Sequence, residues 1–178
     1  MTFKPMFRIA AAASFAMFAL GAVAQVPADP NNPNEALPEK AAFLPYGETI
    51  KLDQAMKAAD AARAEAAKRG WPMCIAVVAP SGDLIYFAKM DDCQYASVRI
   101  AQHKARTAAT YRRPTVVFER LLGKGAFFNY LPTLDDVIAS RGGNPIVVGG
   151  RIIGAIGVSG GTGSQDDVVS QAGAAAIK

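Results

Sequence analysis

Histidine and cysteine are scarce in this chain. Its 178 residues include one histidine, His103, and two cysteines, Cys74 and Cys93. A structural zinc ion needs four clustered ligands and a catalytic zinc ion needs three, so the usual zinc sites are poorly supported. Any metal ligation or acid-base chemistry by an imidazole must therefore involve His103.

The sequence also has no internal repeat, no heptad pattern and no apolar run long enough to span a membrane with ease. An uncharged stretch, residues 9–24, follows Lys4 and Arg8 and ends in Ala22-Val23-Ala24. This pattern is typical of a secretory signal peptide (residues 1–24) cleaved after Ala24, and an uncleaved membrane anchor is the alternative. We expect a periplasmic or secreted protein whose mature chain of 154 residues suffices for one domain.

Charge is low overall but uneven along the chain. The formal net charge is +4 and falls to +2 when the two cations of the signal peptide are removed. Residues 99–124 hold seven Lys or Arg side chains against the single acidic residue Glu119. In an exported protein this local excess favours a small anionic ligand rather than nucleic acid, unless these cations pair with carboxylates of another loop or subunit.

Residues 25–47 contain five prolines, too closely spaced for a helix or a central strand. We interpret this segment as a Pro-rich linker or arm, followed by one domain at 48–178. Thr49 can cap a first helix that ends at Gly70. The apolar side of this helix repeats at spacings of three and four residues: Leu52, Ala55, Met56, Ala59, Ala62 and Ala66.

The rest of the domain alternates hairpins with helices, which predicts an α+β fold with an antiparallel sheet of about five strands flanked by helices. The last strand has a face of small residues, Ala155 and Gly157, which a packed helix usually covers and a flat ligand more rarely. The expected elements are strands at 73–79 and 84–90, helices at 100–112 and 115–122, an aromatic loop at 125–131, a short strand at 137–139, strands at 146–148 and 151–158, and a final helix after 164.

The final helix carries Asp166 and Asp167 in its first turn, after a glycine-rich segment. These carboxylates would repel phosphate, so the segment resembles a phosphate loop only superficially. We interpret both carboxylates as stabilising the helix N-terminus.

The two cysteines could pair in an oxidising compartment. A hairpin centred on Ser81-Gly82 places Cys74 opposite Lys89, which leaves Cys93 about 13 Å away if the strand continues. A disulfide therefore forms only if the chain turns back after Met90, and two unpaired thiols are the alternative.

The helix at 100–112 carries the most distinctive polar group of the chain. At helical pitch His103, Thr107 and Thr110 lie within about 60° of one another, and the alanines lie on the opposite side. Arg99 and Arg106 flank the three polar residues. This arrangement predicts either a ligand-binding face or an ordinary solvated helix surface.

Several motifs together resemble the GlcG/HbpS family of haem-binding proteins, whose domain is also called haem-degrading. The resemblance spans Thr49 to Lys178, and its sharpest motif is Gly-Ala-Ile-Gly-Val-Ser-Gly at 154–160. The others are His-Lys-Ala-Arg-Thr-Ala at 103–108, Arg-Pro-Thr at 113–115 and Gly-Gly-Asn-Pro-Ile at 142–146. This chain departs from the family in the segment Lys89-Met90-Asp91-Asp92-Cys93, where the family often has Arg-Met-Asp-Gly-Ala.

The resemblance implies a profilin-like sheet, symmetric homo-oligomers and haem as the cofactor or ligand. The family's Lys-Ala-x-Thr-Ala segment falls on Lys104 to Ala108, so the resemblance makes Thr107 a candidate near the metal. His103 is a candidate metal ligand through its own chemistry. Basic neighbours could pair with the haem propionates. The expected ligand-binding residues are His103, Lys104, Arg106, Thr107 and Tyr111.

Three functions remain open at this stage. The first is an exported, non-catalytic binding protein for haem or a related anionic tetrapyrrole, which serves haem handling or redox sensing. The second is an enzyme that degrades haem or assists an oxidoreductase, although no acidic residue lies within one helical turn of His103. The third is a ligand-free oligomer or a partner of a membrane sensor.

Overall fold

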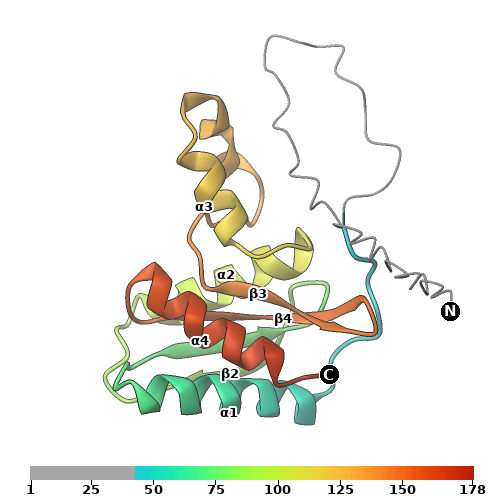
Figure 1. Cartoon of the computed structure of the whole chain (residues 1–178), viewed down its shortest axis with the longest axis vertical. Helices are drawn as coiled ribbons and strands as arrows, with labels where there is room; N and C mark the ends of the chain where they lie inside the picture. The colour runs from blue at the N-terminus through green and yellow to red at the C-terminus, as the bar shows by residue number, and fades with distance from the viewer. Residues whose placement is uncertain (1–42) are drawn as a thin grey trace, which may run out of the picture. The chain divides into compact units, whose positions relative to one another are not determined.

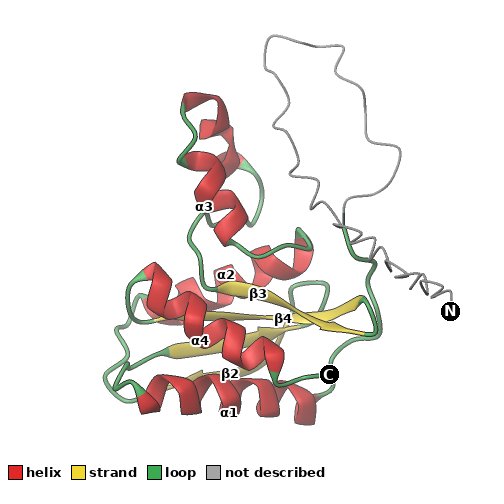
Figure 2. Ribbon diagram, viewed as in Figure 1, coloured by secondary structure: helices red, strands yellow, loops and turns green. Residues whose placement is uncertain are grey.

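The computed structural model describes residues 43–178, so the expected signal peptide and most of the Pro-rich linker lie outside the described part. The described helices and strands follow one another in the expected order (Figures 1 and 2). They are α1 (Leu52–Lys68), β1 (Cys74–Val78), β2 (Leu84–Lys89), α2 (Ser97–Thr110), α3 (Val116–Leu122), the 3-10 helix η1 (Ala126–Thr133), β3 (Gly143–Val148), β4 (Arg151–Ser159) and α4 (Gly163–Ala175).

The sheet is antiparallel, with strand order β2-β1-β4-β3. Helices α1 and α4 cover one of its faces and α2 covers the other. Strand β1 lies between β2 and β4 and is buried along its whole length. The α+β class and the flanking helices are thus confirmed, but the described sheet has four strands and not about five.

The missing strand is the one expected at 137–139. Ile138 donates its backbone N–H to the hydroxyl of Thr107, at 3.1 Å, rather than to a neighbouring strand. Asp136, just before it, has a φ of 55°, a backbone conformation that breaks an extended run. A side chain of α2 therefore takes the hydrogen bond that a fifth strand would need.

The described end of the linker, residues 43–47, lies beside β4. Tyr46 forms a parallel bridge with Ile152, and Ile152 donates its N–H to the carbonyl oxygen of Pro45 at 2.9 Å. The hydroxyl of Tyr46 shares its proton between the carbonyl oxygens of Ala109 and Thr110 at the end of α2, at 3.1 and 2.9 Å. This short segment thus joins the first half of β4 to the end of the helix that carries His103.

Helix α1 packs through alanines because small side chains let it lie close to α4 and the sheet. Its buried residues are Ala55, Ala58, Ala59, Ala62 and Ala66. Leu52 and Met56, expected on the same face, are instead exposed. The helix begins after Lys51, two residues later than a cap at Thr49 would place it.

The small face of β4 is covered by a helix, as its residues indicated. A Cβ on Gly157 would collide with the carbonyl oxygen of Ala101 and the backbone nitrogen of Ala105. Helix α2 therefore packs directly on the strand backbone, and no flat ligand can lie between them.

Helix α3 and η1 project from one end of the sheet (Figure 1) and form a small cluster of their own. Phe118, Leu131 and Val137 are its buried members. Phe127 and Tyr130 stay about half exposed, so the aromatic loop closes this cluster only in part.

Cys74 and Cys93 form a disulfide, with Cα atoms 6.0 Å apart. The hairpin does place Cys74 opposite Lys89. The chain then turns back, since Met90 donates its N–H to the carbonyl oxygen of Met73 and Cys93 donates to that of Met90.

Among residues 43–178, no helix is both long and apolar enough to cross a membrane.

Candidate functional site

His103 lies half-buried on the outer side of α2, the side away from β4. Its Nε2 atom is buried and has no hydrogen-bond partner among the described residues. A buried polar nitrogen without a partner costs about 1–3 kcal/mol, which few native groups bear without a reason. The one imidazole of the chain therefore has an unused ligating atom.

Thr107, one turn further along α2, is fully buried. Its hydroxyl donates to the carbonyl oxygen of Asp136 at 2.5 Å and accepts the N–H of Ile138 at 3.1 Å. A hydroxyl has one proton to donate, and this proton is already used. Thr107 therefore fixes the loop at 136–138 to α2.

Lys104 is buried on the inner side of α2, where 2% of its surface is exposed. Its Nζ lies 2.6 Å from a carboxylate oxygen of Asp166, which is equally buried. Burial raises the pKa of Asp166, while the charge of Lys104 and the N–H of Gly161 oppose that rise. The carboxylate that we interpreted as only a helix stabiliser is thus half of an internal ion pair that joins α2 to α4.

Arg106 and Tyr111 contact the same loop as Thr107. The guanidinium of Arg106 lies 3.2 Å from Asp136, and both side chains are about 40% exposed. Tyr111 donates its hydroxyl to the carbonyl oxygen of Asp135 at 2.6 Å. The structure therefore brings the expected residues together on one helix, but several of them already serve to hold the loop at 135–138.

The sequence contains a signal for a buried partner of Lys104. Lys104 stands among Ala101, Ala105 and Ala108 on the packing side of α2, where a lysine needs an acidic partner. The spacing of residues along one helix cannot show which acid supplies it. The role of the loop at 135–138 had no such signal, because Thr107 bonds to its backbone.

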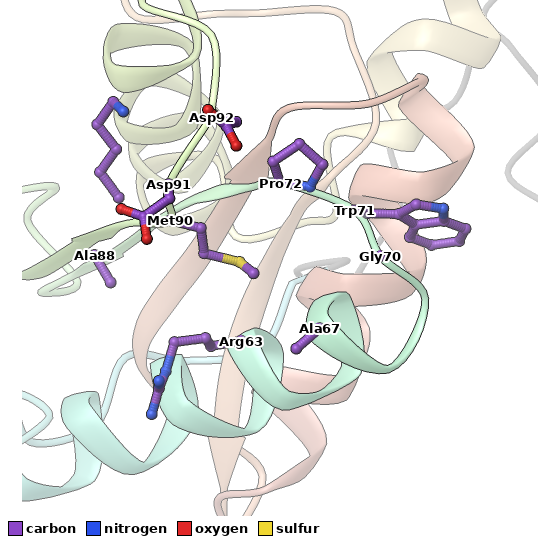
Figure 3. A pocket seen from close by; sticks show the side chains of 10 residues that line it. Arg63, Ala67, Gly70, Trp71, Pro72, Ala88, Met90, Asp91 and Asp92 are labelled. Atoms are coloured by element: carbon purple, nitrogen blue, oxygen red, sulfur yellow. The ribbon is translucent and has the colours of Figure 1, made fainter.

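A cavity of about 550 Å³ lies elsewhere, between the end of α1 and the end of β2. Figure 3 shows Met90 extending into it from the strand end and Trp71 turning its ring away. Arg63 lies on the α1 side, and Asp91 lies on the loop whose sequence departs from the family pattern. This cavity includes none of the expected ligand-binding residues.

A model of the family described as haem degrading protein HbpS-like matches residues 50–175. The chain belongs to this family. The family resemblance expected from the motifs at 103–108, 142–146 and 154–160 is thus confirmed.

Two curated relatives match this chain over most of their own length. The protein GlcG of Escherichia coli K12 is 43% identical over 113 residues, which cover 62% of this chain and 82% of GlcG. An uncharacterised 15.0 kDa protein from the dhaT-dhaS intergenic region of Citrobacter freundii is 34% identical over 125 residues, which cover 69% of this chain and 88% of that protein.

Solved structures share the fold. The crystal structure of HbpS has a TM-score of 0.69 and 28% identity, and the match covers 80% of this chain and 99% of HbpS. Protein ORFY of Klebsiella pneumoniae has a TM-score of 0.69 and 26% identity, with 79% and 97% covered. A PduOC:heme complex has a TM-score of 0.67 and 25% identity, with 73% and 96% covered. Haem is thus present in a structural relative of this chain.

Proposed function

We propose that this protein is an exported binding protein for haem or a related anionic tetrapyrrole, with His103 as the ligand to the iron. The observation that carries the proposal is the buried Nε2 of His103, which has no partner among the described residues. A neutral imidazole nitrogen is a common protein ligand to haem iron. The HbpS-like family and the PduOC:heme relative support haem as the ligand.

The residues around His103 fit haem in part. His103 is only partly buried, but its Nε2 is not exposed, so binding to the iron requires the ring to adopt another side-chain rotamer. Arg106 is exposed enough to pair with a propionate if it leaves Asp136. Thr107, Lys104 and Tyr111 have internal partners, so we assign them to the support of α2 and its loop.

The outer side of α2 needs a further surface to enclose a haem. His103 does not line the cavities of about 550, 440 and 390 Å³ found among residues 43–178. Ligand sites usually bury most of the ligand surface. We therefore propose that a second copy of the chain covers the haem, which agrees with the homo-oligomer implied by the family resemblance. Haem handling or redox sensing, with a membrane sensor as partner, is the role that such a site would serve.

Titration of the purified protein with haemin tests this proposal. We expect a shifted Soret band with wild type and at least tenfold weaker binding for His103→Ala. Thr110→Ala is the matched control, since Thr110 lies on the same side of α2 and its hydroxyl donates only to the carbonyl oxygen of Arg106. An unshifted Soret band with wild type, or an identical band in His103→Ala, contradicts the proposal.

The description of the family as haem degrading favours one second candidate, an enzyme that opens the haem ring. Among the described residues, no carboxylate is hydrogen-bonded to His103 and could orient it for acid-base work. Incubation of the haem complex with an electron donor and oxygen separates the two functions. Loss of the Soret band with release of iron and a linear tetrapyrrole supports the enzyme, and a stable band supports the binding protein.

A further inference from the structure

A second cavity, about 440 Å³, lies between residue 44 of the linker, the end of α2, strand β3 and the C-terminal end of α4. His103 does not line it. Most of its wall is apolar, and the polar side chains on the wall are Arg112, Asn144 and Gln171. The apolar part includes Leu44, Pro145, Val147, Ile152, Ala174 and Ile177. We call this cavity the Arg112 groove.

Arg112 has an unusual backbone position at the edge of this groove. Its φ is 54°, in the left-handed region, directly after the C-cap residue Tyr111. That position usually takes glycine or asparagine, because a larger side chain costs about 1–2 kcal/mol there. A guanidinium placed at this cost suggests that its charge serves a purpose at the groove.

The charge of Arg112 has no carboxylate partner within residues 43–178. Its guanidinium lies 5.3 Å from the ring centre of Phe43 and 5.4 Å from that of Tyr46. The adjacent Arg113 stacks on Phe43 at 4.1 Å, and burial together with the charge of Arg112 lowers the pKa of Arg113. The charges of Arg112 and Arg113 therefore repel each other, and neither has a carboxylate partner within residues 43–178.

The two amide side chains that line the groove, Asn144 and Gln171, both donate hydrogen bonds to one carboxylate. Asp167 accepts hydrogen bonds from Asn144 at 3.1 Å and from Gln171 at 2.7 Å, one on each carboxylate oxygen. Asp167 itself does not line the groove. Arg112 is therefore the one charged residue among those that line the groove, beside an apolar wall.

We propose that the Arg112 groove binds a small amphipathic monocarboxylate. The carboxylate pairs with the guanidinium of Arg112, and the hydrocarbon part lies against the apolar wall. An extended peptide that adds to the edge of β3 fits less well, because Pro145 in that edge strand has no N–H to offer. This inference is independent of the haem proposal, since the two sites share no residue.

Hexanoate is a suitable probe, and amide chemical shifts in nitrogen-15 NMR spectra of the purified protein report where it binds. We expect saturable shifts at Val147, Gln171 and Ala175. Hexan-1-ol lacks the charge and acetate lacks the chain, so each should bind at least tenfold more weakly. Absence of shifts with hexanoate, shifts elsewhere on the protein, or equal binding of hexan-1-ol overturns the proposal.

Variants distinguish specific binding in the groove from nonspecific electrostatic attraction of the anion to the protein. Arg112→Gln should weaken hexanoate binding at least tenfold, and Ala175→Phe, at an exposed position on the wall, should block the groove. Arg120→Gln is the matched control, because Arg120 is an exposed arginine that does not line the groove. His103→Ala should leave hexanoate binding unchanged, so failure of the haem proposal is distinguished from failure of this one. Equal weakening in Arg112→Gln and Arg120→Gln contradicts a specific site.

Discussion

The two sides of helix α2 differ in how their polar groups are used. On the inner side, Lys104 is buried and its Nζ is bonded to Asp166. Thr107 lies on the same side of the helix as His103, but the loop at 136–138 buries it and bonds its hydroxyl. On the outer side, His103 has a ligating nitrogen with no described partner, and Arg106 forms only an exposed ion pair. Polar residues one turn apart on a single helix can therefore differ in role, since one supports the fold while the other is free to bind a ligand.

The largest effect is expected from the inner side. Asp166→Ala leaves the buried charge of Lys104 unpaired, which should lower the free energy of unfolding by about 3–5 kcal/mol. Denaturation by urea measures it. The double variant Lys104→Met/Asp166→Leu should recover most of the loss, because two apolar side chains need no partner. A loss below about 1 kcal/mol in Asp166→Ala would show that the pair is not a main support of α2.

A smaller effect is expected at Thr107. Thr107→Val keeps the shape of the side chain but leaves the buried backbone of the loop without its partner, which should cost about 1–3 kcal/mol. Haem binding by the folded variant should stay within about threefold of wild type. A normal stability with abolished haem binding would instead make Thr107 a direct ligand.

The structure explains why the fold was easier to predict than the site. The hairpin register that pairs Cys74 with Lys89 and the small face of β4 at Gly157 both follow from local patterns of residues, and both are observed. Partners far apart in the chain, such as Lys104 and Asp166, depend on tertiary packing. Helical spacing placed Thr107 with His103, but a loop 29 residues later takes its hydroxyl.

The half-exposed ion pair between Glu119 and Arg141 offers a comparison with the buried pair. A hydrogen bond from Arg141 lowers the pKa of Glu119, so this pair stabilises the fold above the unfolded pKa of about 4.3. The stabilisation is lost as pH falls through the lower, folded pKa. At pH 6, thermal denaturation should give wild type a higher free energy of unfolding than Glu119→Gln, by up to about 1 kcal/mol. This difference should shrink toward pH 3. A difference that grows on acidification contradicts the assigned direction.

The smallest effect on stability is expected on the outer side of α2. His103→Ala removes the unpartnered Nε2, which favours the variant, and also the packing of a partly buried ring, which favours wild type. Because the two effects oppose each other, the free energy of unfolding should change by less than about 1 kcal/mol. A large loss would mean that His103 supports the fold, and the contrast between the two sides of α2 would disappear.

Because the chain contains a single histidine, labelling histidine with nitrogen-15 marks one side chain in a protein made without a histidine tag. Pulsed electron paramagnetic resonance of the ferric haem complex then tests whether that nitrogen touches the iron. We predict a hyperfine coupling between the iron and the labelled nitrogen of His103. A haem complex that forms without this coupling would contradict the assignment of His103 as the iron ligand.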